Sequence, residues 1–219
     1  MSDPGYSVVP NCLSDADCNR ITDALSEIPR GRAGIRHLMS NPAVSAWARS
    51  EVLVQLAGKW LGGSAIPYRA TLFEKTSGAN WLVPWHQDTA LPLTSKFDAP
   101  GWGPWSEKSG VTYAHAPAWA LSRVIALRVH LDPSQAANGP LRVLPGSHAA
   151  GLLSEGEVSR WVSSVEPVAC LIPRGGVVAM RPLLLHASSK VLSDEPRRVL
   201  HIEYADSLDL ADGIRLALA

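Results

Sequence analysis

The sequence predicts a mainly β fold, a β-sandwich or jelly roll, with helices flanking its N-terminal side. From about residue 66 onward the chain is a succession of short β-branched segments bounded by Pro, Gly, Asn and Asp, whereas the residues before it carry helix start and stop signals. The 219 residues, 46% of them hydrophobic, suffice for one sizeable core but are short for two full domains. We therefore expect a single domain over residues 1–219, with a helical flank at about 1–65 and a β core at about 66–205.

Two helices are expected in the flank. The first follows Ser14 and Asp15, which are favourable N-cap residues, and continues to about Glu27. The second is expected to run without interruption over about 42–61, because Asn41-Pro42 suits a helix start and a Gly-Gly pair follows. The partly apolar face of the second helix predicts that it packs against the core and does not bind a ligand.

Seven segments of the core have the composition of β-strands, being short, rich in β-branched residues and separated by turn-forming residues. A helix at about 155–163 interrupts them. Residues 94–119, rich in Gly, Pro, Ser and Trp, are expected to form a long ordered loop such as a lid. The expected strands lie within YRATLFEK (68–75), WLVPWHQD (81–88), RVIALRVHLD (123–132), LRVLPGSH (141–148), PVACLIP (167–173), GGVVAMRPLLLH (175–186) and RRVLHIEYA (197–205).

Charge and composition argue against several classes of function. The 20 basic and 20 acidic side chains balance, so neither nucleic acid nor a membrane surface is expected as a partner. The first residues lack the pattern of a signal peptide, and no apolar run approaches the ~20 residues of a membrane-spanning helix. The three cysteines, Cys12, Cys18 and Cys170, form no CxxC motif, which predicts a reducing, cytoplasmic location.

A histidine and an aspartate stand one residue apart in the segment PWHQD. Alternate residues of a strand point the same way, so His86 and Asp88 can present their side chains to one site. His186 closes a later strand and can supply a third group. Two histidines and one carboxylate are the ligand set that holds non-haem Fe(II) in a facial triad, which leaves positions open for a cosubstrate and O2. The pattern therefore predicts a redox-active metal site.

An arginine follows this constellation at a spacing that suits a carboxylate ligand. Arg197 lies eleven positions beyond His186, on what we expect to be the following antiparallel strand. Its guanidinium can form a bidentate pair with a carboxylate, and Ser188, on the same face as His186, can add a hydroxyl donor. A dicarboxylate cosubstrate can then chelate the metal at one end and meet Arg197 and Ser188 at the other. The neighbouring Arg198 points the opposite way and is expected at the surface.

Four pieces of the sequence, taken in order, resemble one family. The segments HQD, NGPLRVLPGSH, LLLHASS and RRVLHIEYA are similar to those of the phytanoyl-CoA dioxygenase family of Fe(II)- and 2-oxoglutarate-dependent oxygenases, over roughly residues 66–205. The resemblance implies a double-stranded β-helix, a cupin-like jelly roll, with iron between its two sheets. It also implies that His86, Asp88 and His186 ligate the iron.

The resemblance extends to the cosubstrate. It implies that Arg197 and Ser188 contact the far carboxylate of 2-oxoglutarate, with Gln87 as a further possible contact. The family often adds a residue from the strands before the HxD motif, and Tyr68 and Thr71 are the candidates for that role in this sequence.

The activity implied by the resemblance is hydroxylation of a C–H bond in a small-molecule substrate, with O2 consumed and succinate and CO2 released. Asp88 favours hydroxylation over halogenation, because a small residue in its place would leave a coordination site for halide. Desaturation and ring formation use the same ligands and stay open. Two other classes of function also stay open: a catalytically silent jelly-roll protein that binds metal and ligand, and a zinc hydrolase with the same three ligands.

Three further residues are candidates for substrate contacts. In RVIALRVHLD, Arg128 lies on the face opposite the apolar residues, so it either belongs to an outer polar face or points into the barrel to meet a substrate carboxylate. Trp102 and Trp105 lie close to the metal motif in sequence, so they either pack in the core or wall the substrate channel, and the channel is the favoured alternative.

Four other histidines are not expected to take part in the site. His148, in the segment PGSH, is expected to fix the turn after a strand. His37, His115 and His201 have no candidate partner nearby in sequence and are expected to be structural or exposed.

Overall fold

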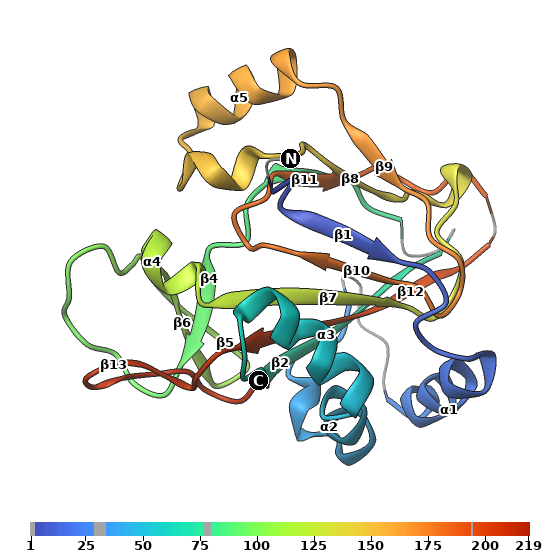
Figure 1. Cartoon of the computed structure of the whole chain (residues 1–219), viewed down its shortest axis with the longest axis horizontal. Helices are drawn as coiled ribbons and strands as arrows, with labels where there is room; N and C mark the ends of the chain where they lie inside the picture. The colour runs from blue at the N-terminus through green and yellow to red at the C-terminus, as the bar shows by residue number, and fades with distance from the viewer. Residues whose placement is uncertain (1–2, 29–33, 77–79, 194) are drawn as a thin grey trace.

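Two antiparallel β-sheets face each other at the centre of the protein. The computed structural model describes residues 3–28, 34–76, 80–193 and 195–219. The smaller sheet lies above the larger one in the view of Figure 1, and the predicted mainly β jelly roll is confirmed. The larger sheet contains, in spatial order, β1 (Tyr6–Val9), β10 (Val177–Met180), β7 (Val124–His130), β12 (Arg197–Ala205) and β2 (Ile66–Lys75). The smaller sheet contains β3 (Val83–His86), β11 (His186–Ser188), β8 (Leu141–Val143) and β9 (Val168–Cys170).

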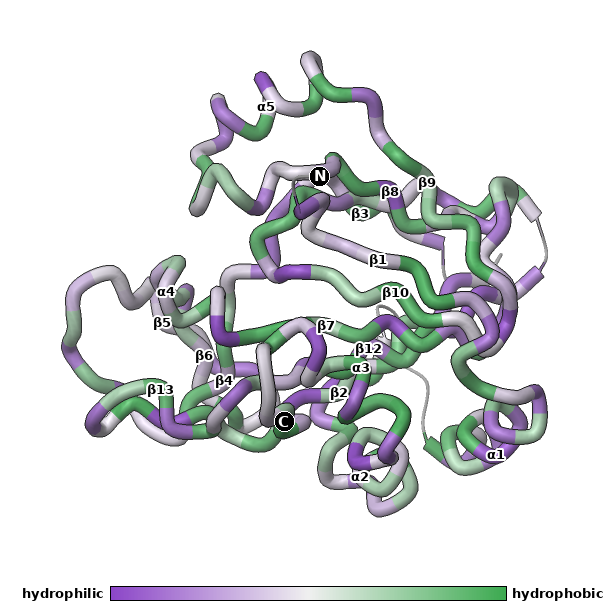
Figure 2. Tube along the Cα trace, in the orientation of Figure 1, coloured by the Kyte–Doolittle hydropathy of each residue, from purple (hydrophilic) through white to green (hydrophobic). Residues whose placement is uncertain are grey.

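The central strand β7 shows that the larger sheet is buried on both faces. All seven of its residues are buried. Ile125, Leu127 and Val129 belong to the hydrophobic cluster that the helices cover, as the alternation predicts. Figure 2 shows mostly hydrophobic residues along β7 and β10. Arg128 points the other way, toward the space between the two sheets, and this polar inner face marks the region where a site can form.

The first predicted helix is confirmed as α1 (Asp15–Ser26). Its N-terminus carries a capping box: the Ser14 side chain accepts from the backbone N–H of Asp17, and the Asp17 carboxylate accepts from the backbone N–H of Ser14. The buried residues Ile21 and Leu25 join the cluster on the outer face of the larger sheet. The helix therefore packs against the core.

The second predicted helix is in fact two helices, so the prediction of one continuous helix is wrong. α2 (Pro42–Ala48) begins at Asn41, whose side-chain oxygen accepts two backbone N–H groups of the first turn. The chain leaves the helix at Ser50, which has extended backbone (φ −61°, ψ 145°), and α3 (Glu51–Leu61) begins there. The break redirects the chain, so that α2 packs against β2 while α3 packs against β7.

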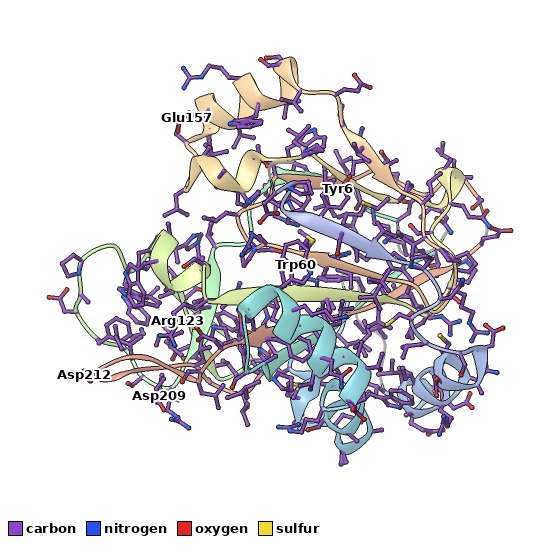
Figure 3. All side chains as sticks on the ribbon, in the orientation of Figure 1. Tyr6, Trp60, Arg123, Glu157, Asp209 and Asp212 are labelled. Atoms are coloured by element: carbon purple, nitrogen blue, oxygen red, sulfur yellow. The ribbon has the colours of Figure 1, made fainter. Side chains whose placement is uncertain are left out.

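A strand precedes these helices, so the expected flank is not purely helical. β1 pairs antiparallel with β10 at one edge of the larger sheet, where Tyr6 lies opposite Met180 (Tyr6 is labelled in Figure 3). Four residues are too few for a two-residue period to stand out from sequence alone. The pairing with a strand about 170 residues away is what makes this segment a strand.

Residues 94–119 do not form the expected loop. They hold β5 (Trp105–Lys108), β6 (Val111–His115) and α4 (Ala118–Leu121), and the two strands form a three-stranded sheet with β4 (Ala90–Leu93). The hairpin turns at Ser109 and Gly110, where φ is +48° and +78°. Two successive positive φ values are typical of tight hairpin turns. The high content of Gly, Pro and Trp hides these short strands in the sequence.

The last predicted helix is confirmed as α5 (Glu155–Ser164), which lies on the side of the smaller sheet, away from the N-terminal helices (Figure 1). Within the described residues, no helix combines the length and the apolar character that crossing a membrane requires. Short 3₁₀ helices occupy three connections: η1 (Leu38–Ser40), η2 (Ala136–Asn138) and η3 (Ser147–Ala150).

The chain ends in a small hairpin formed by β13 (Asp209–Ala211) and β14 (Ile214–Arg215). Arg123, labelled in Figure 3 close to this hairpin, donates from Nε to the carboxylate of Asp206 at 2.9 Å and from Nη1 to the carbonyl of Leu210. These bonds anchor the C-terminal segment to the start of β7.

Candidate metal centre

His86 and His186 lie opposite each other in the smaller sheet, at the end of β3 and the start of β11. Their ring centroids are 4.2 Å apart. Asp88 follows β3 and places its carboxylate oxygens 3.8 Å from His86 Nε2 and 3.5 Å from His186 Nε2. One ligand atom from each of the three residues lies within 4.8 Å of the other two. The fold thus brings together the three predicted ligands, although about 100 residues separate them in sequence.

Both histidines present Nε2 to this site. His86 Nδ1 lies 2.8 Å from the carbonyl oxygen of Pro84, and His186 Nδ1 lies 2.9 Å from that of Leu184. A carbonyl only accepts, so each Nδ1 carries a proton, and each Nε2 is the ring nitrogen left to bind a metal. Burial lowers the pKa of His186 to about 4, so its ring is neutral at pH 7.

Asp88 is held as a carboxylate. Burial favours its neutral form, but the neighbouring histidines and the charge of Arg69 outweigh burial and hold its pKa well below the usual range. The backbone N–H of Asp88 donates to the carbonyl of Pro182 at 2.9 Å, which fixes the segment after β3. Two imidazoles and one carboxylate, all from one side, are a donor set that fits a divalent metal with open coordination positions.

A cavity of about 120 Å³ runs from this triad between the two sheets, and we call it the inner cavity. Its described lining residues include four cationic side chains and two carboxylates. These are Arg69, Lys75, Arg128, Arg197, Asp88 and Glu203. The inner cavity therefore has an excess of positive charge before any metal is counted, which suits an anionic ligand.

The end of the inner cavity remote from the triad is built by Lys75, Ser188 and Arg197. Lys75 and Arg197 are direct cross-strand partners in β2 and β12. Lys75 Nζ donates to Ser188 Oγ at 2.8 Å and to the carbonyl of Ser189 at 2.7 Å. Burial, together with the charges of Arg197 and Arg128, lowers the pKa of Lys75 to about 8. Sequence analysis missed Lys75, since its place opposite Arg197 depends on the register of two strands far apart in the chain.

Arg197 points into the inner cavity and Arg198 points out, as predicted. Arg197 is 2% exposed, and its Nε donates to the carbonyl of Asn138 at 3.2 Å. Its Nη1 is buried without a hydrogen-bond partner among the described residues. Burial, with a contribution from Arg128, lowers its pKa to about 9. Arg198 instead makes two 2.7 Å bonds to Asp132. A buried guanidinium without a counter-charge is costly, so this end of the cavity is suited to an added anion.

A chain of hydrogen bonds crosses the inner face of the larger sheet beside the triad. Arg128 lies directly across from His201, and its Nη1 is 3.2 Å from His201 Nδ1. Because a guanidinium only donates, His201 Nδ1 accepts and His201 Nε2 donates to Glu203 at 3.2 Å. Glu203 also accepts from the Tyr68 hydroxyl at 2.8 Å and from Arg69 at 3.2 Å. This chain holds Arg128 toward the cavity, so of its two alternatives the interior position is the one observed.

Of the two expectations for His201, structural or exposed, the structural one is observed. His201 is 4% exposed, lines the inner cavity and bridges Arg128 and Glu203. Alternation along β12 already places His201 on the same face as Arg197. Of the two upstream candidates, Tyr68 is bound to Glu203, whereas Thr71 lies opposite His201 with a buried Oγ1 that has no partner among the described residues. Thr71 is therefore the better placed of the two.

Gln87 does not offer its amide to the inner cavity, contrary to expectation. Its side-chain nitrogen donates to the carbonyls of Gly151 and Leu183, both at 2.8 Å. Its side-chain oxygen accepts from the backbone N–H of Leu153 at 2.9 Å. The amide thus connects the segment after β3 to the chain before α5, and it stabilises the backbone that positions the site.

Trp102 and Trp105 also differ from expectation, since neither lines the two cavities that border the triad in the described structure. Both rings pack edge-on against Phe97, with centroids 5.2 and 5.1 Å away, on the hydrophobic cluster beside the three-stranded sheet. Trp81 and Trp85 stand at the cavities instead, Trp81 at the inner one and Trp85 at the outer one.

A second cavity of about 610 Å³, the outer cavity, opens on the other side of His86. Its walls come from β3, from the segment around Gly101 and Gly103, and from the start of α5. Apolar side chains such as Trp85 and Leu153 alternate there with polar ones. Because His86 lines both cavities, a molecule in the outer cavity lies next to the triad.

The remaining histidines lie outside the triad. His148 is part of η3, in keeping with its predicted place in a turn. His37 Nε2 is 2.9 Å from the Tyr113 hydroxyl, and His115 Nδ1 is 2.7 Å from the Thr89 hydroxyl.

Comparison with known proteins decides the family. Residues 1–199 match the phytanoyl-CoA dioxygenase (PhyH) family. The chain belongs to this family. The resemblance carried by the four sequence motifs is thus confirmed, and so is the prediction of an iron- and 2-oxoglutarate-dependent dioxygenase over a catalytically silent binding protein. The donor set of the triad fits the iron of this family, and the cationic inner cavity fits the dianionic cosubstrate.

Individual relatives agree with this assignment. L-proline trans-4-hydroxylase of Streptomyces griseoviridis is 25% identical over 242 aligned residues, which cover 91% of this chain and 82% of the relative. The crystal structure of AviO1 from Streptomyces viridochromogenes Tue57 matches with a TM-score of 0.68 at 22% identity, over 93% of this chain and 90% of that one. HygX from Streptomyces hygroscopicus, solved with nickel and 2-oxoglutarate bound, matches with a TM-score of 0.67 at 15% identity, over 93% and 84% of the two chains.

Proposed function

We propose that this family member hydroxylates a C–H bond of a small-molecule substrate, with His86, Asp88 and His186 holding the iron and residues 1–219 acting as one catalytic domain. The observation that carries the proposal is a single cavity with two complementary ends. One end presents three metal-binding groups, and the other presents the buried guanidinium of Arg197, which has no acid partner of its own in the described chain. A 2-oxo dicarboxylate can satisfy both ends at once.

Three side chains would hold the far carboxylate of 2-oxoglutarate. Arg197 contributes charged N–H donors, and Ser188 contributes its hydroxyl. Lys75 adds an ammonium group with three protons, two of which already bind Ser188 and the carbonyl of Ser189. The third proton remains for the cosubstrate.

The charges of the inner cavity support a dianionic cosubstrate. Asp88 is committed to the metal, and Arg69 is paired with Glu203 at 3.2 Å. Three cations then remain without a carboxylate partner in the described part of the chain; these are Lys75, Arg128 and Arg197. Burying unpaired charge is unfavourable, and the two carboxylates of 2-oxoglutarate would offset much of this cost.

The protein chain itself positions the substrate and excludes water from the region beside His86. Iron, 2-oxoglutarate and O2 together supply the oxidising power for hydroxylation and leave succinate and CO2 as coproducts. His86 and Asp88 would hold the metal where His86 lines both cavities. A substrate in the outer cavity would rest against Trp85 and Leu153, which displaces water beside His86 and directs one C–H bond toward the metal.

An anaerobic titration tests this function. Fe(II) and then 2-oxoglutarate are added to the apo-protein, and the visible charge-transfer band of the chelated complex is followed. We expect the band in the wild-type protein and not in His86→Ala. His148→Ala is the matched control, because His148 lies outside the triad, and it should keep the band. Folded wild-type protein that gives no band, or His86→Ala that consumes 2-oxoglutarate at the normal rate, would overturn the proposal.

A further inference from the structure

Cationic side chains gather around Tyr113 beside the metal end of the inner cavity. Lys108 Nζ lies 4.8 Å from the centroid of the Tyr113 ring, and Arg69 Cζ lies 5.3 Å from it. His37 Nε2 is 2.9 Å from the Tyr113 hydroxyl. Arg36 precedes His37 in the chain, and its charge helps to lower the pKa of both His37 and Lys108, after the effect of burial. We call Arg36, Arg69 and Lys108 the Tyr113 cluster.

Three separate elements deliver this cluster. Arg69 comes from β2, and Lys108 comes from the end of β5, next to its hairpin turn. Arg36 follows Ile35, which forms an antiparallel bridge with Leu72 of β2. The cluster therefore depends on the tertiary fold, because no sequence motif connects its members.

Little negative charge balances the Tyr113 cluster. Within the described residues, neither Arg36 nor Lys108 forms an ion pair with an acid, and the one carboxylate near Arg69 is Glu203. Glu203 is shared with the Tyr68 hydroxyl and with His201. Arg69 also keeps a buried Nε without a hydrogen-bond partner in the described chain. Like charges held together without counter-charges are unfavourable, and an anionic ligand would relieve this.

Arg69 connects the Tyr113 cluster to the metal centre. It lines the inner cavity together with His86 and Asp88. Its Nη1 also lies 3.4 Å from the carbonyl oxygen of Ala90, two residues beyond Asp88. An anionic group held by the cluster would therefore place the rest of the same molecule beside the triad.

The outer cavity, unlike the Tyr113 cluster, is not positively charged as far as the structure describes its lining. Its described lining residues include no Lys or Arg, and Glu155 is the one carboxylate among them. A substrate that spans both regions would direct its anionic group to the Tyr113 cluster and its uncharged part to the outer cavity.

We propose that the substrate is a small carboxylic acid whose carboxylate is recognised by Arg36, Arg69 and Lys108 around Tyr113. This assignment rests on the proposed function and names the substrate class for it. Arg69 offers the planar donor fork that suits a carboxylate, and Arg36 and Lys108 add positive charge beside it. These residues determine specificity and do not take part in the chemistry.

Matched pairs of acids and amides test the assignment on the whole protein. The anaerobic Fe(II)·2-oxoglutarate complex is titrated with L-proline, benzoate and hexanoate and with the corresponding carboxamides, and the shift of the charge-transfer band on binding is measured. We expect at least one acid to bind, and its amide to require at least tenfold higher concentration. Lys108→Ala and Arg36→Ala, both at partly exposed or exposed positions, should weaken that acid about tenfold and leave the 2-oxoglutarate titration unchanged. Exposed Lys96→Ala is the control and should change neither titration.

The outcomes distinguish failure of the carboxylate assignment from failure of the proposed hydroxylase function. A complex that never forms its band with 2-oxoglutarate is a failure of the proposed function. If the band forms but acid and amide bind equally, or Lys108→Ala binds the acid like wild type, the carboxylate assignment is wrong. Failure of every acid to bind the loaded protein at 10 mM also overturns it, as does a phosphate monoester, phenyl phosphate, that binds more tightly than all three acids.

Discussion

Replacing Arg197 by methionine should stabilise the ligand-free protein and weaken its binding of 2-oxoglutarate. Methionine fills similar space without a charge or a hydrogen-bond donor. In the ligand-free protein Arg197 is 2% exposed and its Nη1 has no partner in the described chain. In the proposed complex the same guanidinium meets a carboxylate. The substitution therefore removes an unpaired buried charge from the ligand-free protein, and it removes a contact with 2-oxoglutarate from the complex.

The size of both effects follows from the surroundings of Arg197. Burial lowers its pKa from the usual range to about 9. At about 1.4 kcal/mol for each pH unit, the charged side chain costs several kcal/mol, against about 1 kcal/mol for the lost hydrogen bond to Asn138. We expect the free energy of unfolding of the ligand-free protein to rise by about 1–3 kcal/mol. Two charge-assisted hydrogen bonds of about 1.5 kcal/mol each predict a Kd for 2-oxoglutarate roughly 100-fold higher.

Urea denaturation with and without 2-oxoglutarate separates these effects. At ligand concentrations well above both Kd values, a 100-fold weaker site loses about 2.7 kcal/mol of the stabilisation that the ligand provides. Arg198→Met is the matched control. It removes the largely buried pair with Asp132 on the outer side of the same strand, should lower stability by about 1–3 kcal/mol, and should leave the Kd unchanged. An Arg197→Met protein that keeps the wild-type Kd, or that is less stable than wild type by more than about 2 kcal/mol without ligand, would refute the reasoning.

Two other predictions concern the same cavity. Binding of 2-oxoglutarate should weaken as the pH rises through about 8, because that is the pKa to which burial and two arginines lower Lys75, and the cosubstrate needs the ammonium form. The Kd at pH 8 should be about twofold higher than at pH 7, whereas Lys75→Met should show a raised Kd that hardly changes over this range; a flat wild-type profile in isothermal titration would contradict the role of Lys75. Gln87→Leu removes three hydrogen bonds to the backbone, so the free energy of unfolding should fall by about 2–3 kcal/mol while the Kd for 2-oxoglutarate stays within twofold of wild type. If the Kd for 2-oxoglutarate rises as much in Gln87→Leu as in Arg197→Met, Gln87 contacts the cosubstrate after all, as the sequence suggested.

The predictions from sequence succeeded where the signal is local. His86 and Asp88 share a face because side chains alternate along a strand, and the same alternation sends Arg197 inward and Arg198 outward. The capping box at the start of α1 is likewise contained in four consecutive residues. These features need no knowledge of the rest of the chain.

The predictions failed where a distant segment decides the structure. Four-residue β1 is a strand because β10 is available to pair with it, and the 42–61 helix breaks because α2 and α3 pack against different strands. Gln87 turns away from the inner cavity because backbone groups near Gly151 and Leu183 are close enough to bind its amide.

The sequence by itself determined the jelly-roll class, the shared face of His86 and Asp88, and the opposite directions of Arg197 and Arg198, since these depend on residue type and on alternation along a single strand. Only the tertiary structure decided that Lys75 stands opposite Arg197, that His201 and Glu203 orient Arg128, and that Arg69 and Lys108 meet at the ring of Tyr113. The physical reason is strand register. A shift of one residue turns every side chain of a strand to the other face, and the register between strands far apart in sequence is fixed by the packing of the whole core.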